Sequence, residues 1–262
     1  MTTQQLFDTV ATHLLTQRTH LPESVLTGRP SARLSTSYGF IDTRPLVETA
    51  LAAGFQVTSA MATRSRRDPA SAKHMVRLRP SGIAPVNGVY PELVIVNSHN
   101  GTSTLRVFAG LFRLVCSNGL IVADATFAPP LILRHNQTAQ RHIAPLLQTS
   151  LDQVQAVVER IPQFVGTGMT MAAQQAYAER AATLSATPIN PEHLLRARRS
   201  EDTASDLWTI YNRVQEHLMR GGLPTMRPNA RRLASTRSIT SITRDMTINT
   251  ALWSLTNEFL EA

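Results

Sequence analysis

The sequence predicts an α+β protein: a small antiparallel sheet of three to four strands, packed with helices and followed by a mostly helical C-terminal half. Between residues 55 and 107, several short segments alternate apolar and polar residues, as half-buried strands do. Between residues 149 and 260, apolar residues recur almost throughout at helical spacing. Hydrophobic residues make up 42% of the chain and charged residues 17%, which is typical of a globular protein.

The N-terminal part is expected to be helical with an intervening loop. An amphipathic helix is predicted over residues 4–16, and a loop over residues 19–37. A second helix is predicted over residues 42–54, because Pro45 fits the first turn of a helix and Gly54 fits its end.

The sheet is expected to follow directly. Alternation predicts strands over residues 55–63 and 73–79, and a short apolar strand over residues 92–96. The Asn-Gly pair at positions 100 and 101 predicts a hairpin turn, with residues 102–107 as the returning strand.

Helices are expected to cover and extend this sheet. Apolar residues at helical spacing predict a helix over residues 105–115, which Asn118-Gly119 ends; a short β-like run follows over residues 120–123. Further helices are predicted over residues 151–161 (ended by Pro162), 169–184, 191–199, 204–220 and 243–260. We therefore expect an α+β core with a basic hairpin over residues 1–148, and a helical region packed on it over residues 149–262.

Composition also narrows the class of protein. The 262 residues contain no apolar run long enough to span a bilayer, and no secretory signal is expected at the N-terminus. The single cysteine, Cys116, excludes an internal disulfide framework and fits a buried apolar position. These observations predict a soluble, cytoplasmic protein with no membrane contact.

The balance of charge favours a polyanionic partner. Lys and Arg number 26 against 18 Asp and Glu, giving a net charge of +8, and every cation except Lys73 is Arg. A genome rich in G and C explains the preference for Arg over Lys, but not the excess of cations over anions. Because the guanidinium group presents a planar set of donors that suits phosphate, nucleic acid is the expected partner.

The strand at 73–79 carries the main candidate site. Side chains alternate along a strand, so Lys73, Arg77 and Arg79 share one face about 20 Å long, at roughly 3.3 Å per residue. The preceding turn adds Arg64, Arg66 and Arg67. This row is predicted to line a groove that follows a phosphate backbone. The alternative is an ordinary solvated sheet face.

Two further sets of cations are candidates. Arg106 and Arg113 are seven residues apart in the predicted helix, and either contact phosphate or pair with Glu48 or Glu92. The loop over residues 223–240 either clamps a strand of nucleic acid or only aids solubility. Its cations are Arg227, Arg231, Arg232 and Arg237.

Catalytic and metal-binding patterns are missing from the sequence. It contains no glycine-rich phosphate loop followed by Lys, no His-Glu-x-x-His motif and no spaced carboxylate pair. His135, His142, His193 and His217 show no metal-ligand spacing. A binding protein without enzymatic activity, cofactor or metal is therefore predicted.

Two blocks of the sequence carry a family resemblance. The first block is Asn97-Ser98-His99-Asn100-Gly101-Thr102-Ser103, then Arg106, Ala109-Gly110 and residues 112–120. The second block is Val214-Gln215-Glu216, Arg220-Gly221-Gly222, Thr236-Arg237, Ile242, Arg244-Asp245 and Ala251-Leu252-Trp253. Together they resemble the phage/plasmid-like protein family, which is catalogued as a domain of unknown function. The resemblance covers residues 37–261 and implies a role in the biology of mobile DNA.

The expected core, a helix, three strands and a helix with a basic hairpin, is also similar in outline to single-strand annealing proteins of phage recombination systems, of the Erf and Redβ kinds. Those proteins form rings that hold single strands in a basic groove, and annealing without ATP requires no nucleotide-binding loop. Because aromatic residues make up only 5% of this chain, contacts to the nucleic-acid backbone are expected to dominate over base stacking.

The first hypothesis is a homo-oligomeric protein of a phage or plasmid that binds single-stranded DNA without sequence specificity and anneals strands in recombination or replication. The alternative is a mobile-element protein that inhibits a host defence complex through contacts with a host or phage protein. A third hypothesis is an unrecognised nuclease. Salt-dependent DNA binding favours the first, and capture of a protein partner after nuclease treatment favours the second.

Overall fold

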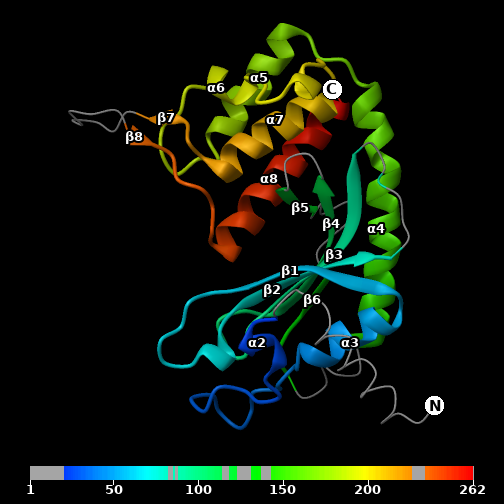
Figure 1. Cartoon of the computed structure of the whole chain (residues 1–262), viewed down its shortest axis with the longest axis vertical. Helices are drawn as coiled ribbons and strands as arrows, with labels where there is room; N and C mark the ends of the chain where they lie inside the picture. Colours follow the sequence, from blue (N-terminus) through cyan, green and yellow to red (C-terminus); the bar gives the residue numbers. More distant parts are fainter. Residues whose placement is uncertain are drawn as a thin grey trace.

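The computed structural model describes residues 21–81, 85, 88–113, 118–122, 131–136, 143–225 and 234–261. The helix predicted over residues 4–16 lies outside this part of the chain. The structure confirms the α+β class, with a larger sheet than predicted and a mostly helical C-terminal part (Figure 1).

A six-stranded antiparallel sheet forms the centre of the molecule. The strand order is β1-β2-β3-β4-β5, and β6 pairs with the half of β4 that β5 leaves free. The strands are β1 (Phe55–Ala62), β2 (His74–Pro80), β3 (Val89–Asn97), β4 (Leu105–Arg113), β5 (Asn118–Val122) and β6 (Leu131–Leu133).

Helices surround the sheet and form the C-terminal part. They are α2 (Glu23–Leu26), α3 (Arg44–Ala52), α4 (Ile143–Gly166), α5 (Met171–Ala182), α6 (Glu192–Leu195), α7 (Leu207–Arg220) and α8 (Ile242–Glu261). Short 3₁₀ turns, η1 (Pro69–Ser71) and η3 (Ser200–Asp202), and a small hairpin of β7 (Pro224–Thr225) and β8 (Ala234–Ser235) complete the described elements. Figure 1 shows α4 running along one side of the sheet.

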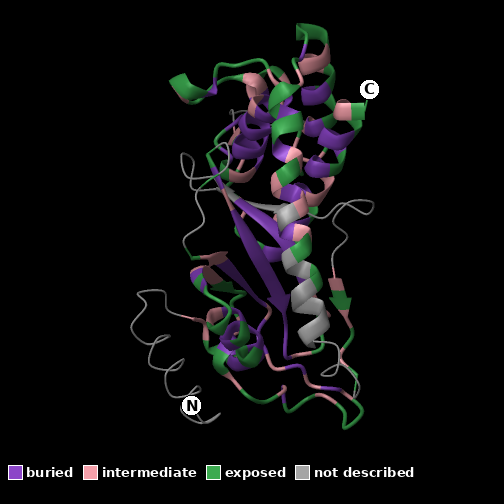
Figure 2. Cartoon of the chain, turned by 90° about the vertical axis from the view of Figure 1, so that its right-hand side faces the viewer, coloured by how far each residue is buried: buried purple, intermediate pink, exposed green. Residues whose placement is uncertain are grey.

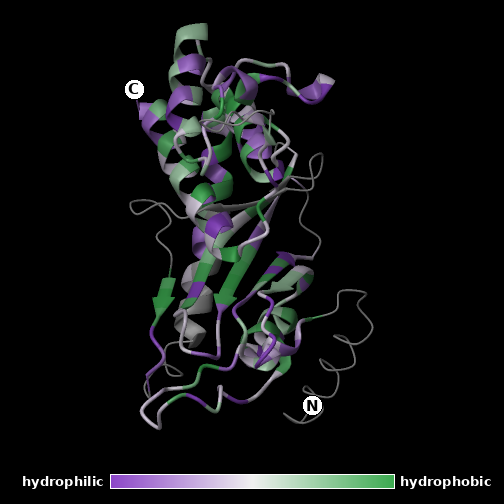
Figure 3. Ribbon diagram, turned by 90° about the vertical axis from the view of Figure 1, so that its left-hand side faces the viewer, coloured by the Kyte–Doolittle hydropathy of each residue, from purple (hydrophilic) through white to green (hydrophobic). Residues whose placement is uncertain are grey.

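The central strands of the sheet are buried on both faces. Val76 and Leu78 of β2 pack with Leu46 of α3 on one face. On the other face, Met75 packs with Ile242 and Met246 of α8. Figure 2 shows the strands as a buried layer, and Figure 3 shows that these strands are rich in hydrophobic residues.

The helix predicted over residues 105–115 is wrong, because this segment forms strand β4. Leu105 and Val107 are buried on the α3 side, whereas Phe108 is buried on the α8 side. A strand buried on both faces carries apolar residues at odd and even positions, which imitates helical spacing. Asn118-Gly119 accordingly begins strand β5 instead of ending a helix.

Most of the other predicted elements are found near their expected positions. Helices α3, α5, α7 and α8 and strands β1 and β2 agree with the predicted ranges to within a few residues. Helix α4 starts earlier than expected and continues past Pro162 to Gly166. Because Ile161 and Phe164 are both fully buried, tertiary packing holds the helix together beyond the proline.

Membrane-spanning segments are not found among the described helices. None of them combines the length and the apolar character needed to cross a bilayer.

Candidate functional site

The predicted basic face of β2 exists, but it is not an open groove. Met75 and Arg77 point to the same side of the sheet, as the alternation requires, and α8 covers that side. Arg77 is only 6% exposed. The burial of Arg77 argues against a phosphate groove along this part of the face, because strand alternation fixes the face of a residue but not what packs on that face.

Glu92 on β3 neutralises both of these arginines. Its carboxylate lies 3.3 Å from Nη1 of Arg77 and 3.0 Å from Nη2 of Arg79, and it accepts a hydrogen bond of 2.9 Å from the Thr58 hydroxyl. Glu92 itself is fully buried. The Arg79 guanidinium also lies 4.1 Å from the centre of the Tyr90 ring. Arg77 and Arg79 are therefore part of an interior ion-pair cluster that links strands β2 and β3.

Lys73 and Arg106 have a different environment, in a hollow of about 430 Å³ that we call the Lys73 pocket. The Lys73 ammonium donates to the Thr243 hydroxyl at 3.1 Å, and Nε of Arg106 donates to the Thr104 hydroxyl at 3.3 Å. Burial, together with the charge of Arg106, lowers the pKa of Lys73. None of the described residues that line this pocket is Asp or Glu, so its two cations favour an anion.

The loop between β3 and β4 builds one wall of the Lys73 pocket. Gly101 adopts a φ of +77°, which favours glycine. The Asn100 side-chain oxygen accepts hydrogen bonds from the backbone N–H and the hydroxyl of Thr102, at 3.1 and 2.6 Å. This tight turn places the hydroxyl-bearing residues Thr102, Ser103 and Thr104 along the pocket.

A buried network of histidines lies behind this wall. Nδ1 of His74 donates to the Ala72 carbonyl at 2.9 Å, so its Nε2 accepts from the Thr43 hydroxyl at 2.8 Å. The Thr43 oxygen in turn accepts from Nε2 of His99 at 3.1 Å and from the Asn97 amide at 2.9 Å. The network thus assigns one neutral tautomer to each of these two histidines.

His135 links the network to the Lys73 pocket. Its Nε2 donates to Asn97 Oδ1 at 2.9 Å, and its ring stacks on Tyr38 with the centroids 4.8 Å apart. Burial lowers the pKa of His135, that of His74 to about 4 and that of His99 to about 3. This network was not predicted from the sequence; its local signal is the first sequence block, which contains Asn97 and His99.

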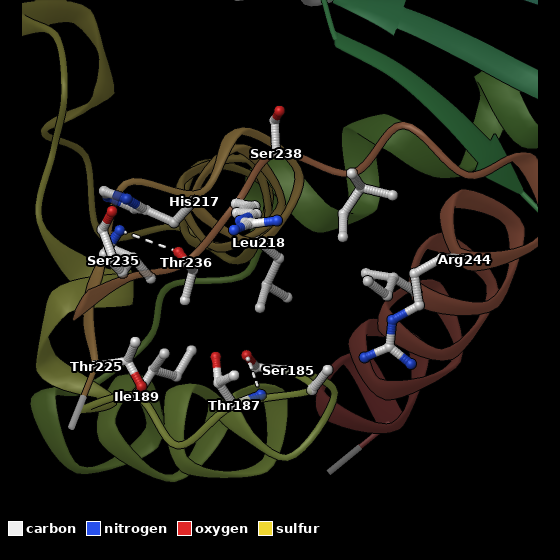
Figure 4. A pocket seen from close by; sticks show the side chains of 15 residues that line it. Ser185, Thr187, Ile189, His217, Leu218, Thr225, Ser235, Thr236, Ser238 and Arg244 are labelled. Atoms are coloured by element: carbon white, nitrogen blue, oxygen red, sulfur yellow. Dashed lines mark hydrogen bonds between the residues drawn. The ribbon is translucent and has the colours of Figure 1, made fainter. Parts of the chain in front are cut away.

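A second hollow, of about 330 Å³, lies between the end of α7, the β7–β8 hairpin and the start of α8; we call it the hairpin pocket. Its cations are Arg237 and Arg244, and none of the described residues that line it is acidic. Figure 4 shows Ser185 and Thr187 along one wall, Thr236 across the hollow and the Arg244 side chain at one end. The hairpin pocket is therefore also suited to an anion.

Backbone contacts at two glycines hold the hairpin pocket in shape. The N–H of Gly222 donates to the Thr236 carbonyl at 2.8 Å, and the N–H of Leu223 donates to the Thr236 hydroxyl at 3.1 Å. A Cβ atom on Gly221 would lie 2.6 Å from the carbonyl carbon of Arg237. The segments around Gly221 and Thr236, which both belong to the second sequence block, thus contact each other at the hairpin pocket.

We expect the substitution Gly221→Ala to destabilise the protein by about 1–3 kcal/mol from backbone strain alone, since Gly221 has φ 68° and ψ −149°. The close approach to Arg237 adds to this loss. Urea unfolding of the variant measures the effect. Gly166→Ala is the control, because its Cβ meets nothing within 4 Å and φ there is not positive. Equal stability of the two variants would contradict the tight contact.

The two pockets lie on either side of the first turns of α8. Thr243 lines the Lys73 pocket, and the next residue, Arg244, lines the hairpin pocket. Figure 1 shows the β1–β2 connection, the start of α8 and the β7–β8 hairpin all on the left-hand side of that view. Cations from distant parts of the sequence therefore line neighbouring hollows.

The remaining predicted cations fall into two groups. Arg64, Arg66 and Arg67 are exposed, in a loop that starts beside Lys73, because the Thr63 N–H donates to the Lys73 carbonyl at 2.8 Å. Arg106 and Arg113 belong to strand β4, so the helical spacing that paired them in the prediction does not apply. The side chain of Arg113 and the residues Arg227, Arg231 and Arg232 lie outside the described part of the chain.

Metal ligation has no support in the described residues. There, no group of three or more His, Cys, Asp or Glu side chains is placed to hold a metal ion.

Comparison with known proteins identifies the family. The chain is 34% identical over 233 residues to the UPF0380 protein YafZ of Escherichia coli K12, and 32% identical over 232 residues to the UPF0380 protein YfjQ of the same strain. Each alignment covers 86% of this chain and 84% of the relative. No solved structure matches the chain significantly. The profile of the domain of unknown function DUF932 matches residues 31–253, so the chain belongs to the DUF932 family.

Proposed function

We propose that this protein binds single-stranded nucleic acid, DNA in particular, through contacts to phosphate groups. The observation that carries this proposal is the Lys73 pocket, where Lys73 and Arg106 lie together with hydroxyl groups and without an acidic lining residue among those described. Cations without counter-charge in a recessed site attract an external anion.

A polyanion fits the arrangement better than one small anion. The exposed Arg64 to Arg67 loop, the Lys73 pocket and the hairpin pocket supply cations at separate places around the start of α8. A backbone with a phosphate on every nucleotide engages such sites in succession. The recessed position of Lys73 and of Arg244 favours a flexible single strand over a rigid duplex.

Binding without sequence specificity is consistent with strand annealing by a homo-oligomer in phage or plasmid recombination or replication. That wider role, like the mobile-element origin, stays a prediction. Inhibition of a host defence complex through protein contacts is the competing role. Retention of a protein partner with no DNA, after nuclease treatment, would support the competitor.

Binding is expected to weaken steeply with salt. If phosphate contacts dominate, the logarithm of the association constant falls with the logarithm of salt concentration by about 0.7 for each phosphate contacted. Fluorescence titration of an oligothymidylate and of a DNA duplex at several salt concentrations measures this slope. A flat response, or equal affinity for duplex and single strand, would contradict the proposal.

The double variant Lys73→Ala/Arg106→Ala is expected to bind the oligothymidylate more weakly and to lower the salt slope by about 1.4, for two lost phosphate contacts. The charge-matched control is Arg44→Gln/Arg180→Gln, which removes two cations that are exposed and paired with Glu48 and Glu258. The control should keep the wild-type slope. Equal slopes in the two double variants would exclude the Lys73 pocket as the contact.

A further inference from the structure

A protein that holds single strands must also accommodate the bases, and the described residues offer no exposed aromatic side chain on which to stack them. Trp208 and Trp253 pack against the fully buried Phe164 and Tyr211 in the helical core. Tyr38 is covered by His135, and Tyr90 by Arg79. Bases therefore need another place, and a hollow with apolar walls is the alternative to a stacking platform.

The hairpin pocket has such walls. Leu218 and Leu223, near the end of α7, and Ile248 of α8 are buried residues that line it, and Ile189 and Ile239 complete its apolar surface. A flat nucleobase presents apolar faces, which such a surface covers. A volume of about 330 Å³ lies at the small end of the range for ligand sites, which suits one nucleotide.

Polar groups of the same pocket match the edge of a base. The Thr225 hydroxyl donates a hydrogen bond to the Pro188 carbonyl, and the Thr236 hydroxyl accepts one from the backbone N–H of Leu223. Thr187, Ser235 and Ser238 also line the hollow, and their hydroxyl groups can donate or accept hydrogen bonds. Hydroxyl groups adapt to donors and acceptors alike, so this lining tolerates different bases.

The charges around the pocket match a phosphate. The Arg244 guanidinium is positioned by one hydrogen bond to the Leu184 carbonyl, and Arg237 is exposed at the rim. His217 adds no charge, because its Nε2 donates to the Arg196 carbonyl while its Nδ1 accepts from Nε of Arg198. Two arginines beside an apolar hollow thus form the pattern of a site for an anion joined to an apolar group.

We propose that the hairpin pocket binds one unstacked nucleotide, with the base against the apolar walls and its phosphate on Arg237 and Arg244. The inference rests on the proposed function, which it deepens. Because Thr243 and Arg244 are consecutive, the phosphates of neighbouring nucleotides then reach the Lys73 pocket on the other side of α8. The pocket holds the base out of any stack, which leaves the adjoining bases free to pair.

The test compares three probes on the full chain: thymidine 5′-monophosphate, deoxyribose 5-phosphate and inorganic phosphate. Burial of the base is expected to make the nucleotide bind about tenfold more tightly than the sugar phosphate, by calorimetry or by NMR titration. Arg237→Ala is expected to lower the affinity for the nucleotide and for the sugar phosphate alike, by about tenfold. The substitution removes a charge-assisted contact to the phosphate group that both probes carry.

A variant that fills the hollow tests the position of the base. Ala186 lines the pocket and is exposed, so Ala186→Trp leaves the core intact. The Ala186→Trp variant should therefore bind the nucleotide and the sugar phosphate with equal affinity, without the tenfold preference for the nucleotide. Ala52→Trp, at an exposed position on α3, is the matched control and should keep that advantage.

The possible outcomes separate this inference from the proposed function. If the oligothymidylate binds with the expected salt slope, but the nucleotide and sugar phosphate bind equally, the inference is wrong and the proposed function stands. The inference also fails if Ala186→Trp keeps the preference for the nucleotide. If the nucleotide binds in a manner sensitive to Ala186→Trp while no oligonucleotide binds, the pocket is a nucleotide site and the proposed function fails.

Discussion

Replacing Glu92 with Gln is expected to lower the free energy of unfolding by about 3–5 kcal/mol, because it leaves Arg77 and Arg79 without the carboxylate that both contact. Glu92 and Arg77 are 0% and 6% exposed, so water does not replace the lost interaction. Burial raises the pKa of the nearby Asp245, although the charge of Arg77 acts against this rise, and the carbonyl and carboxylate of Asp245 both accept hydrogen bonds from the Asn249 amide. Urea unfolding at neutral pH measures the loss.

Glu258→Gln is the matched control. Glu258 of α8 pairs with Arg180 of α5, and both side chains are about half exposed. Exposed pairs contribute about 0.2–1 kcal/mol, so this variant should unfold nearly as the wild type does. If Glu92→Gln were no less stable than Glu258→Gln, the interior pairing of Arg77 and Arg79 would be wrong.

Acid is expected to destabilise the protein between about pH 6.5 and pH 4, through the buried histidines. Burial lowers the pKa of His74 from 6.5 to about 4, and that of His99 to about 3. As the pH falls below 6.5, these groups take up protons in the unfolded chain but not in the folded one, so the unfolded state gains stability. His74 alone accounts for a loss of about 3 kcal/mol by pH 4.

Urea unfolding at a series of pH values tests this expectation, and NMR of the imidazole groups identifies the residues. The resonances of His74 and His99 should stay in the neutral form down to about pH 5. His74→Leu, although less stable at neutral pH, should lose less stability on acidification than the wild type. A variant with an unchanged pH slope would show that His74 does not contribute, and that the Thr43 network tolerates protonation.

Strand β2 shows most clearly which features the sequence predicts and which it does not. Alternation alone placed Lys73, Arg77 and Arg79 on one face, and in the structure Glu92 contacts both arginines. The same alternation does not reveal what lies opposite. Helix α8 packs against Met75 of this strand, and its Thr243 accepts a hydrogen bond from Lys73, 170 positions away.

Strand β4 and the histidine network show the same limit. Local spacing does not distinguish a helix from a strand that is buried on both faces, so only pairing with β3, β5 and β6 decided the conformation of residues 105–113. The contacts of Thr43 with His74 and His99 span 31 and 56 positions. No local pattern encodes such contacts.

The sequence by itself determined the α+β class, the positions of most helices and the excess of positive charge, because periodicity and composition are local or additive properties. The tertiary structure decided which cations are neutralised and which are accessible, because a side chain's charge environment depends on the segments that pack around it. Arg77 and Lys73, four residues apart on the same face, differ for this reason: Arg77 contacts the buried Glu92, and Lys73 opens into a pocket without an acidic lining residue among those described.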